Sequence, residues 1–221
     1  MEKKKSTVHL MVAKEAPQET ALASRFGGRP LIPRAATPVW PCCRECKEPM
    51  QFLGQLVLAP EKGERLDRLV LLFMCSADTC ETWDAEQGAN KAMVVVGNSW
   101  KIWEPPQVGG SGTPLLRSDA YGVEVVDWEA QAGDGDAYDP ARQSWADAHK
   151  VARRKVVGQM FGQPSWLQSA DHPECPTCGK EMAFIAQVEE GPRYETSMNF
   201  GGGSAYVFCC GSHAAKFLWQ Q

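Results

Sequence analysis

The sequence predicts an α+β protein with a largely antiparallel sheet, built from two pseudo-repeats with a connecting helix. Three observations support this fold class. Residues 26–57 and 161–188 share a pattern in which FG, a loop, a C-x2-C pair and an apolar segment follow in the same order. Each copy then reaches an apolar run with cysteine at its end, at 69–75 and 205–210. A single helical pattern lies between the copies. Repetition of a whole unit predicts a duplicated scaffold.

The expected organisation has five parts. These are an N-terminal segment at 1–23, a first repeat at 24–103, a linker of loop and strand at 104–139, a helix at 140–157 and a second repeat at 158–221. A chain of 221 residues can form one large domain or two small units with a shared core. We expect the two repeats to form one compact domain.

Short runs of apolar and β-branched residues, separated by polar turns, predict the strands. Before the helix these runs lie at 8–12, 50–59, 66–74, 93–96 and 123–128, and after it at 183–189 and 204–209. Segments rich in charge, glycine or aspartate, such as GDGDAYD and GGGS, predict turns. The apolar C-terminal residues FLWQQ are expected to pack on the core.

The helix is expected to begin at Asp139, a natural N-cap, with Pro140 at its first position. Apolar residues then recur at helical spacing, at Trp145, Ala148, Ala152 and Val156. The basic residues 153–155 would complement the helix dipole in the last turn, and Gly158 would end the helix. This basic cluster could bind an anionic partner, but a solvated helix end is the favoured interpretation.

Composition argues against several classes of partner. The net charge of −4 and pI of about 5.6 argue against non-specific nucleic-acid binding, which uses excess lysine and arginine. No run approaches the ~18 apolar residues that span a bilayer. The first residues lack the pattern of a signal peptide. We therefore expect a cytoplasmic protein without membrane association, where clustered cysteines favour metal or redox roles over structural disulfides.

The nine cysteines predict one or two zinc sites. Zinc in structural sites takes four tetrahedral ligands, and the turn of a C-x2-C pair directs both sulfurs at one ion. The first predicted site consists of Cys43, Cys46, Cys75 and Cys80. The second consists of Cys175, Cys178, Cys210 and His213. Gly179 would allow the left-handed turn after the second pair.

Two cysteines are left over by this assignment. Cys209 and Cys210 are neighbours in an expected strand, so their side chains should face opposite ways. We assign Cys210 to the site and leave Cys42 and Cys209 outside it, with His172 as a reserve ligand. If only one site holds metal, we expect it to be the first.

Two other interpretations of the cysteines stay open. They could be buried thiols that act as small hydrophobic residues. They could also form a redox pair, although the βαβ context of thioredoxin-like motifs is absent from the sequence. The sequence carries no H-E-x-x-H, G-x-S-x-G or phosphate-loop motif, so we predict a non-enzymatic protein. The competing hypothesis is an enzyme whose zinc keeps an open coordination position.

Several motifs resemble the bacterial YwqG-like family, a domain of unknown function. They are SRFGGRP at 24–30, WP at 40–41, PMQFLGQ at 49–55, YVFCC at 206–210 with His213, and FLWQ at 217–220. The first repeat is also similar to the N-terminal region of the programmed cell death protein 2 family. The resemblance covers roughly 24–103 and 158–221. It implies an α+β fold with internal duplication and no established activity. It does not imply metal, because many bacterial members lack some of these cysteines.

The function we predict is a zinc-stabilised module that binds another protein, with metal replacing the core that a half-sized unit cannot build. The resemblance suggests two alternative roles. The first is a toxin-immunity protein whose acidic surface caps a basic toxin. The second is an escort for a ribosomal protein. Gln55 and Gln187 follow matching apolar segments, and we expect their amides to hydrogen-bond exposed backbone.

Overall fold

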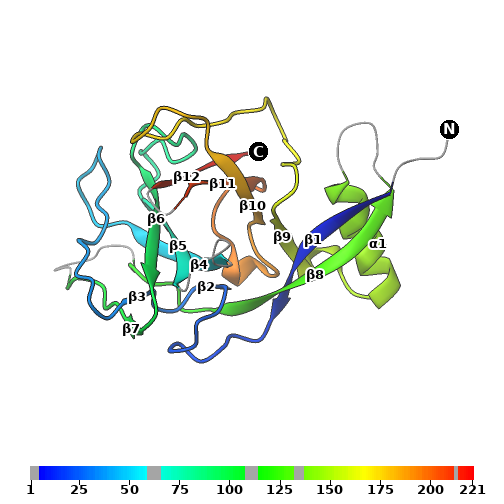
Figure 1. The fold of residues 1–221 in the computed structure, drawn as a ribbon, viewed down its shortest axis with the longest axis horizontal. Coiled ribbons are helices and arrows are strands. Elements are labelled where there is room, and N and C mark those ends of the chain that lie inside the picture. The colour runs from blue at the N-terminus through cyan, green and yellow to red at the C-terminus, as the bar shows by residue number, and fades with distance from the viewer. Residues whose placement is uncertain (1–4, 59–65, 108–113, 132–136, 212–213) are drawn as a thin grey trace.

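The computed structural model describes residues 5–58, 66–107, 114–131, 137–211 and 214–221, and shows a closed barrel of ten antiparallel strands (Figure 1). In chain order the strands are β1 (Lys5–Lys14), β2 (Arg25–Phe26), β3 (Leu31–Pro33), β4 (Gln51–Leu58), β5 (Asp67–Met74), β6 (Asn90–Gly97), β7 (Trp100–Ile102), β8 (Tyr121–Gln131), β9 (Val156–Met160), β10 (Ala183–Glu189), β11 (Ser204–Cys210) and β12 (Ala214–Gln220). The order around the barrel is β1-β8-β2-β4-β5-β6-β12-β11-β10-β9, and β3 and β7 form a separate two-stranded sheet.

The predicted fold class, an α+β sheet built from two pseudo-repeats with a connecting helix, is wrong. β6 of the first predicted repeat pairs with β12 of the second, and on the other side β2 is connected to β9 through β8 and β1. These pairings close the strands into one barrel, whereas the prediction was an α+β sheet built from two pseudo-repeats. The one α-helix among the described residues, α1 (Tyr138–His149), packs outside the barrel, against the long ribbon of β1 and β8 (Figure 1).

The strand order has an internal regularity that positions the cysteines. β4, β5 and β6 are consecutive antiparallel neighbours, and so are β10, β11 and β12. A C-x2-C loop precedes β4 and another precedes β10. β4 and β10 each contain a register shift near their start, at Leu53 and at Ile185. A bulge bends a strand and changes the direction of its side chains, so both strands turn just after their cysteine loops.

Hydrophobic alternation builds the barrel core. One cluster takes buried side chains from all ten barrel strands, for example Met11 of β1, Phe26 of β2 and Phe217 of β12. β5 is buried on both faces: Val70 and Leu72 join this cluster, whereas Leu69, Leu71 and Phe73 join a second cluster beneath β3, β7 and the first cysteine loop. Burial on both faces explains why β5 reads as a continuous apolar run.

The helix is shorter than predicted. It ends at His149 instead of at residue 157, and the C-cap residue Lys150 is in a left-handed conformation with φ of 54°. Residues Arg153–Lys155 form a 3-10 turn, and Val156, which fits the predicted helical spacing, begins β9. Asp139 is not the N-cap: Ala137 holds that position without a side-chain cap, and Asp139 instead pairs with Arg153.

The SRFGGRP motif organises the loop that enters the barrel. The buried Arg25 guanidinium donates to the carbonyl oxygens of Ala21 and Arg29, at 3.2 and 2.6 Å. Gly27 has φ of 77°, and a Cβ there would lie 2.3 Å from the carbonyl oxygen of Asp119. This position therefore requires glycine. The Arg29 guanidinium holds the pKa of Glu19 below its ordinary value by hydrogen bonding to the carboxylate.

Within the part of the chain that the structure describes, no helix is long and apolar enough to cross a membrane.

Candidate metal centres

The first cysteine loop is a compact knuckle, which we define as residues 42–49. An isolated bridge pairs Cys42 with Pro49 and closes its base. The N–H of Cys43 donates to the carbonyl of Glu48 at 2.8 Å, and the N–H of Lys47 donates to the carbonyl of Cys43 at 3.0 Å. Lys47 has φ of 66°, the left-handed conformation that a knuckle needs after its second cysteine.

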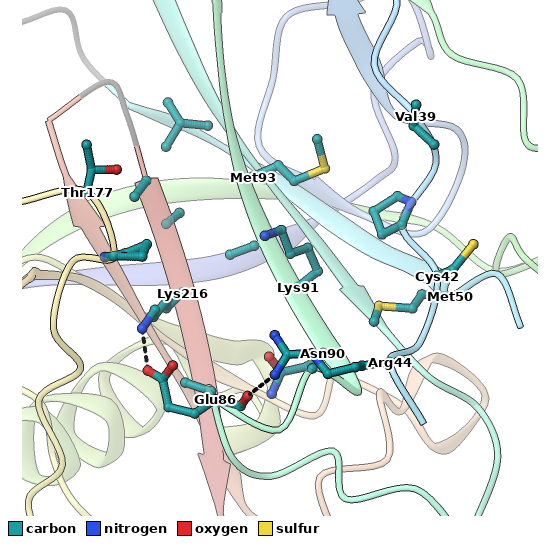
Figure 2. A pocket seen from close by; sticks show the side chains of 18 residues that line it. Val39, Cys42, Arg44, Met50, Glu86, Asn90, Lys91, Met93, Thr177 and Lys216 are labelled. Atoms are coloured by element: carbon teal, nitrogen blue, oxygen red, sulfur yellow. Dashed lines mark hydrogen bonds and ion pairs between the residues drawn. The ribbon is translucent and has the colours of Figure 1, made fainter. Parts of the chain in front are cut away.

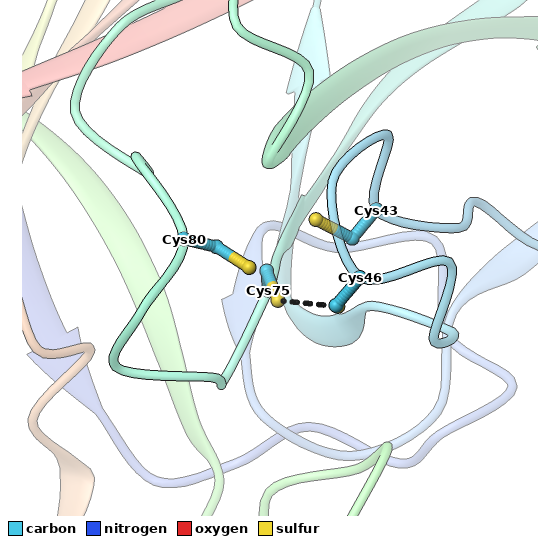
Figure 3. Close-up of side chains that lie close together, drawn as sticks. All are labelled: Cys43, Cys46, Cys75 and Cys80. Atoms are coloured by element: carbon cyan, nitrogen blue, oxygen red, sulfur yellow. Dashed lines mark hydrogen bonds between the residues drawn. The ribbon is translucent and has the colours of Figure 1, made fainter.

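Four thiols meet at the first knuckle (Figure 3). The Sγ atoms of Cys43, Cys46, Cys75 and Cys80 all lie within 4.8 Å of one another. Cys75 follows the end of β5, and Cys80 lies in the loop beyond it. The Sγ atoms of Cys46 and Cys75 are 3.6 Å apart. A tetrahedral ion with metal–sulfur bonds of about 2.3 Å separates its sulfurs by roughly 3.8 Å, whereas a disulfide needs about 2.05 Å.

Burial and backbone donors set the acidity of these thiols. Burial raises the pKa of Cys75 well above its ordinary value, and burial also raises the pKa of Cys80. Burial acts in the same direction on Cys43, but the backbone N–H groups of Cys46 and Glu45 donate to its sulfur and lower its pKa overall. Removing protons from the buried thiols therefore requires a compensating cation, which a bound metal ion supplies.

The second cysteine loop repeats the first in backbone detail, and we define the second knuckle as residues 174–181. An isolated bridge pairs Glu174 with Glu181. The N–H of Cys175 donates to the carbonyl of Lys180 at 2.8 Å, and the N–H of Gly179 donates to the carbonyl of Cys175 at 2.9 Å. Gly179 has φ of 67°, so the predicted left-handed turn is confirmed.

Three described thiols meet at the second knuckle. The Sγ atoms of Cys175, Cys178 and Cys210 lie within 4.8 Å of one another, and those of Cys178 and Cys210 are 3.6 Å apart. Backbone N–H groups of Thr177 and Cys178 lower the pKa of Cys175 to about 7, whereas hydrogen bonds with the other two thiols raise the pKa of Cys210 to about 12. The predicted fourth ligand, His213, lies outside the described residues. Cys178 is exposed, so this cluster is more open to solvent than the first.

The remaining cysteines and the reserve histidine lie apart from both clusters. Cys42 is exposed, and its sulfur lies 3.8 Å from the carbonyl oxygen of Trp40. Cys209 is buried in the barrel core, and its thiol donates to the carbonyl of Gly211 at 2.9 Å. His172 packs edge-on against Trp166 and lies 3.6 Å from the carboxylate of Glu181.

The two buried glutamines satisfy backbone groups, as predicted. Gln55 accepts from the N–H of Leu31 and donates to the carbonyl of Ala23, both at 3.0 Å. Gln187 accepts from the N–H of Ser165 at 2.9 Å and from the Gln159 amide at 3.2 Å.

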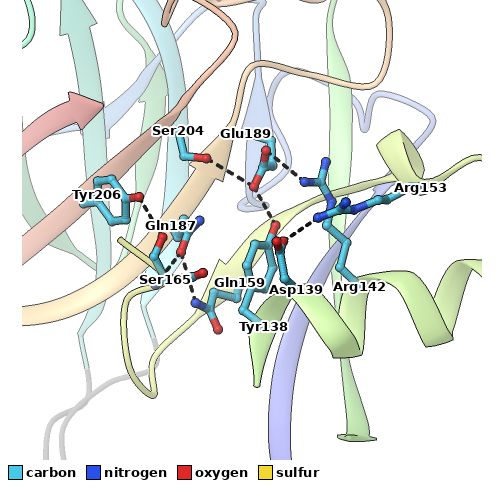
Figure 4. A network of polar contacts seen from close by, with 10 residues as sticks. All are labelled: Tyr138, Asp139, Arg142, Arg153, Gln159, Ser165, Gln187, Glu189, Ser204 and Tyr206. Carbon is cyan, nitrogen blue, oxygen red and sulfur yellow. Dashed lines mark hydrogen bonds and ion pairs between the residues drawn. The ribbon is translucent and has the colours of Figure 1, made fainter. Parts of the chain in front are cut away.

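Figure 4 shows the Gln187 network next to a second network that ties α1 to the barrel. In the second network, Tyr138 donates to Glu189 at 2.9 Å and Arg142 pairs with the same carboxylate at 3.0 Å. The sequence does not predict the hydrogen bond between Tyr138 and Glu189, because 51 residues separate the two side chains.

Comparison with known proteins adds little about chemistry. No family model matches the chain. A segment of 57 residues is 39% identical to the uncharacterized protein YpfL of Salmonella typhimurium. The match covers 26% of this chain and 13% of that protein. The chemistry of the chain is therefore inferred from its own structure, which contains two tight cysteine clusters that could each bind a metal ion.

Proposed function

We propose that this chain is a non-enzymatic, zinc-stabilised module of YwqG-like type that binds another protein in the cytoplasm. A reducing compartment keeps thiols available for metal, which suits nine cysteines without a disulfide among the described residues. The observation that carries the proposal is the first cluster. It supplies four buried or half-buried thiols at the spacing of a tetrahedral site.

The donor set supports zinc in particular. Four sulfur ligands in tetrahedral arrangement select zinc or iron among the common biological metals, and the paired knuckle with its left-handed residue is typical of structural zinc. At the second knuckle three thiols are in place, and His213 is our proposed fourth ligand. The zinc at each site would tie a knuckle to the end of a barrel strand.

A structural role for the first site follows from its closed coordination. Catalytic zinc keeps one position for water or substrate, and four protein sulfurs leave none. We therefore favour binding over catalysis. The proposed partner is a protein, and the two classes to test first are a toxin, as for an immunity protein, and a ribosomal protein, as for an escort.

Metal analysis tests the zinc. Protein purified without chelators is expected to contain one or two equivalents of zinc, measured by inductively coupled plasma mass spectrometry. After dialysis against metal-free buffer, the Cys43→Ser variant should retain less zinc than wild type, and the Cys42→Ser variant should keep the wild-type content. Zinc-free wild-type protein, or equal contents in both variants, would contradict the proposal.

Affinity purification with mass spectrometry tests the partner class. The tagged full-length chain is expected to enrich a toxin or a ribosomal protein. The Cys43→Ser variant, if it unfolds in part, should lose that partner. A chain that captures neither class, but turns over a small molecule in a zinc-dependent manner, would instead favour an enzyme.

A further inference from the structure

A groove of about 620 Å³ lies along β6 and the start of β12, between the two knuckles (Figure 2). Arg44 of the first knuckle forms part of one wall, and Pro176 and Thr177 of the second knuckle form part of the other. Lys91 and Met93 of β6 lie between the walls. Each knuckle thus presents residues from between its own two cysteines to the same groove.

The charge of the groove is opposite to that of the chain. Three of its lining residues are cations, Arg44, Lys91 and Lys216, and one is a carboxylate, Glu86. The chain as a whole carries a net charge of −4. Lys216 pairs with Glu86, while Lys91 is exposed on the strand. A local excess of positive charge in a concave surface attracts anionic groups and disfavours cationic ones.

Arg44 is held in place in this wall. Its N–H donates to the carbonyl of Gly88 at 2.9 Å, and its guanidinium donates to the carbonyl of Glu86 at 3.1 Å. Its side chain covers Gly88, where an added Cβ would lie 2.9 Å from the Cβ of Arg44. A guanidinium that is already oriented by a hydrogen bond loses less freedom on binding a carboxylate than an unrestrained one does, which favours binding.

The groove also offers a strand edge and an apolar rim. β6 pairs with β5 from Asn90 to Gly97, but among the described residues it registers with β12 only where Ala92 meets Ala215. An incompletely paired edge can add an extended chain through backbone hydrogen bonds. Val39 on the rim is 86% exposed, an unusual state for a large apolar side chain.

We propose that this groove binds an extended, acidic segment of a partner protein. Its carboxylates would face Lys91 and Arg44, and its apolar side chains would contact Val39 and Met93. This inference rests on the proposed function, because it locates one surface of the module that contacts an acidic segment of its partner. It also gives the two metal sites a shared role, since each fixes one wall of the groove.

Peptide binding tests the inference directly. The probe is a fluorescein-labelled octapeptide of alternating glutamate and valine, titrated with zinc-loaded full-length protein and followed by fluorescence anisotropy. The peptide with lysine in place of glutamate is the control for charge. We expect the acidic peptide to bind and the basic peptide not to bind. The Lys91→Glu variant should bind the acidic peptide about tenfold more weakly, because attraction is replaced by repulsion. The matched variant Lys5→Glu makes the same change at an exposed position of β1 and should bind like wild type.

Several results would overturn the inference. These are equal binding of the acidic and basic peptides, an unchanged affinity in Lys91→Glu, or an equal loss in Lys5→Glu. Binding of a labelled single-stranded oligonucleotide in place of the peptide would overturn it too, and would assign the groove to nucleic acid. Zinc content and melting temperature of each variant establish that the fold is intact. If Lys91→Glu keeps its zinc and captures the wild-type partner equally well, the groove assignment fails while the proposed function stands.

Discussion

Adjacent cysteines give the sharpest test of the first metal site. Cys43 is 1% exposed and belongs to the four-thiol cluster, whereas its neighbour Cys42 is exposed and lies outside it. The substitutions Cys43→Ser and Cys42→Ser make the same chemical change one residue apart. We expect Cys43→Ser to lower the melting temperature substantially and Cys42→Ser to leave it nearly unchanged.

The expected magnitude follows from linkage between metal binding and folding. Free zinc at about a thousand times its dissociation constant stabilises the native state by about 4.1 kcal/mol. If the loss of one of four sulfurs weakens zinc binding about a hundredfold, the remaining stabilisation is about 1.4 kcal/mol, a loss of about 2.7 kcal/mol. For a chain of 150–250 residues, each kcal/mol shifts the melting temperature by about 2–4 °C, so the expected decrease is about 5–11 °C.

Differential scanning calorimetry with and without a chelator measures this effect. The chelator should lower the melting temperature of wild type and of Cys42→Ser, and it should change Cys43→Ser much less, because that variant has less metal-derived stability to lose. A wild-type melting temperature that does not respond to the chelator would refute the reasoning. So would equal melting temperatures for the two serine variants.

Three further predictions concern the scaffold. Gly158→Ala should lower the free energy of unfolding in urea by about 3 kcal/mol or more, because φ is 145° and a Cβ would lie 2.1 Å from a carbonyl oxygen of β10. The control Gly162→Ala, with φ of 77° and open space around it, should lower the same free energy by only about 1 kcal/mol. Gln55→Met keeps the side-chain volume but leaves a buried backbone N–H of β3 without its acceptor, so we expect a loss of about 1–3 kcal/mol and faster hydrogen exchange at that amide. Glu19→Gln removes a carboxylate whose pKa is lowered mainly by a hydrogen bond from Arg29. This carboxylate stabilises the folded protein above its unfolded-state pKa, and the stabilisation is lost as pH falls through its folded-state pKa. Because the pair is partly exposed, the variant should cost less than about 1 kcal/mol at neutral pH and nothing in acid, measured by unfolding at both pH values.

Local patterns in the sequence predicted the strands better than their arrangement. The runs at 66–74, 183–189 and 204–209 lie within one residue of β5, β10 and β11. β9 was not predicted because its sequence, VVGQM at 156–160, directly follows the basic residues 153–155. Val156 therefore fits the spacing of the predicted helix as well as it fits a strand. Closure of the barrel depends on long-range pairings such as β1 with β8, in which Lys5 meets Gln131. No local pattern encodes such a pairing.

The sites were more predictable than the fold. A C-x2-C pair imposes its turn locally, so the sequence identified which thiols the structure brings together at each knuckle. Strand alternation separated Cys209, which faces the barrel core, from Cys210, which joins the second cluster. The groove had no such signal. Arg44 and Thr177 lie inside the two C-x2-C pairs and Lys91 lies on β6, but no local pattern predicts that these residues line one groove.

The position of the clusters explains how metal would act on the groove. Each candidate site joins a knuckle to the end of a strand about thirty residues later, with Cys46 and Cys75 separated by 29 residues and Cys178 and Cys210 by 32. Each metal ion would close a hairpin by connecting the start of one strand to the end of the next, which restricts the unfolded chain as a cross-link does. β6 and β12 lie beside these hairpins, and among the described residues they register with each other at one pair. Metal ions on both sides of this junction would hold the walls of the proposed groove in place, so the groove could receive a partner segment without loss of the fold.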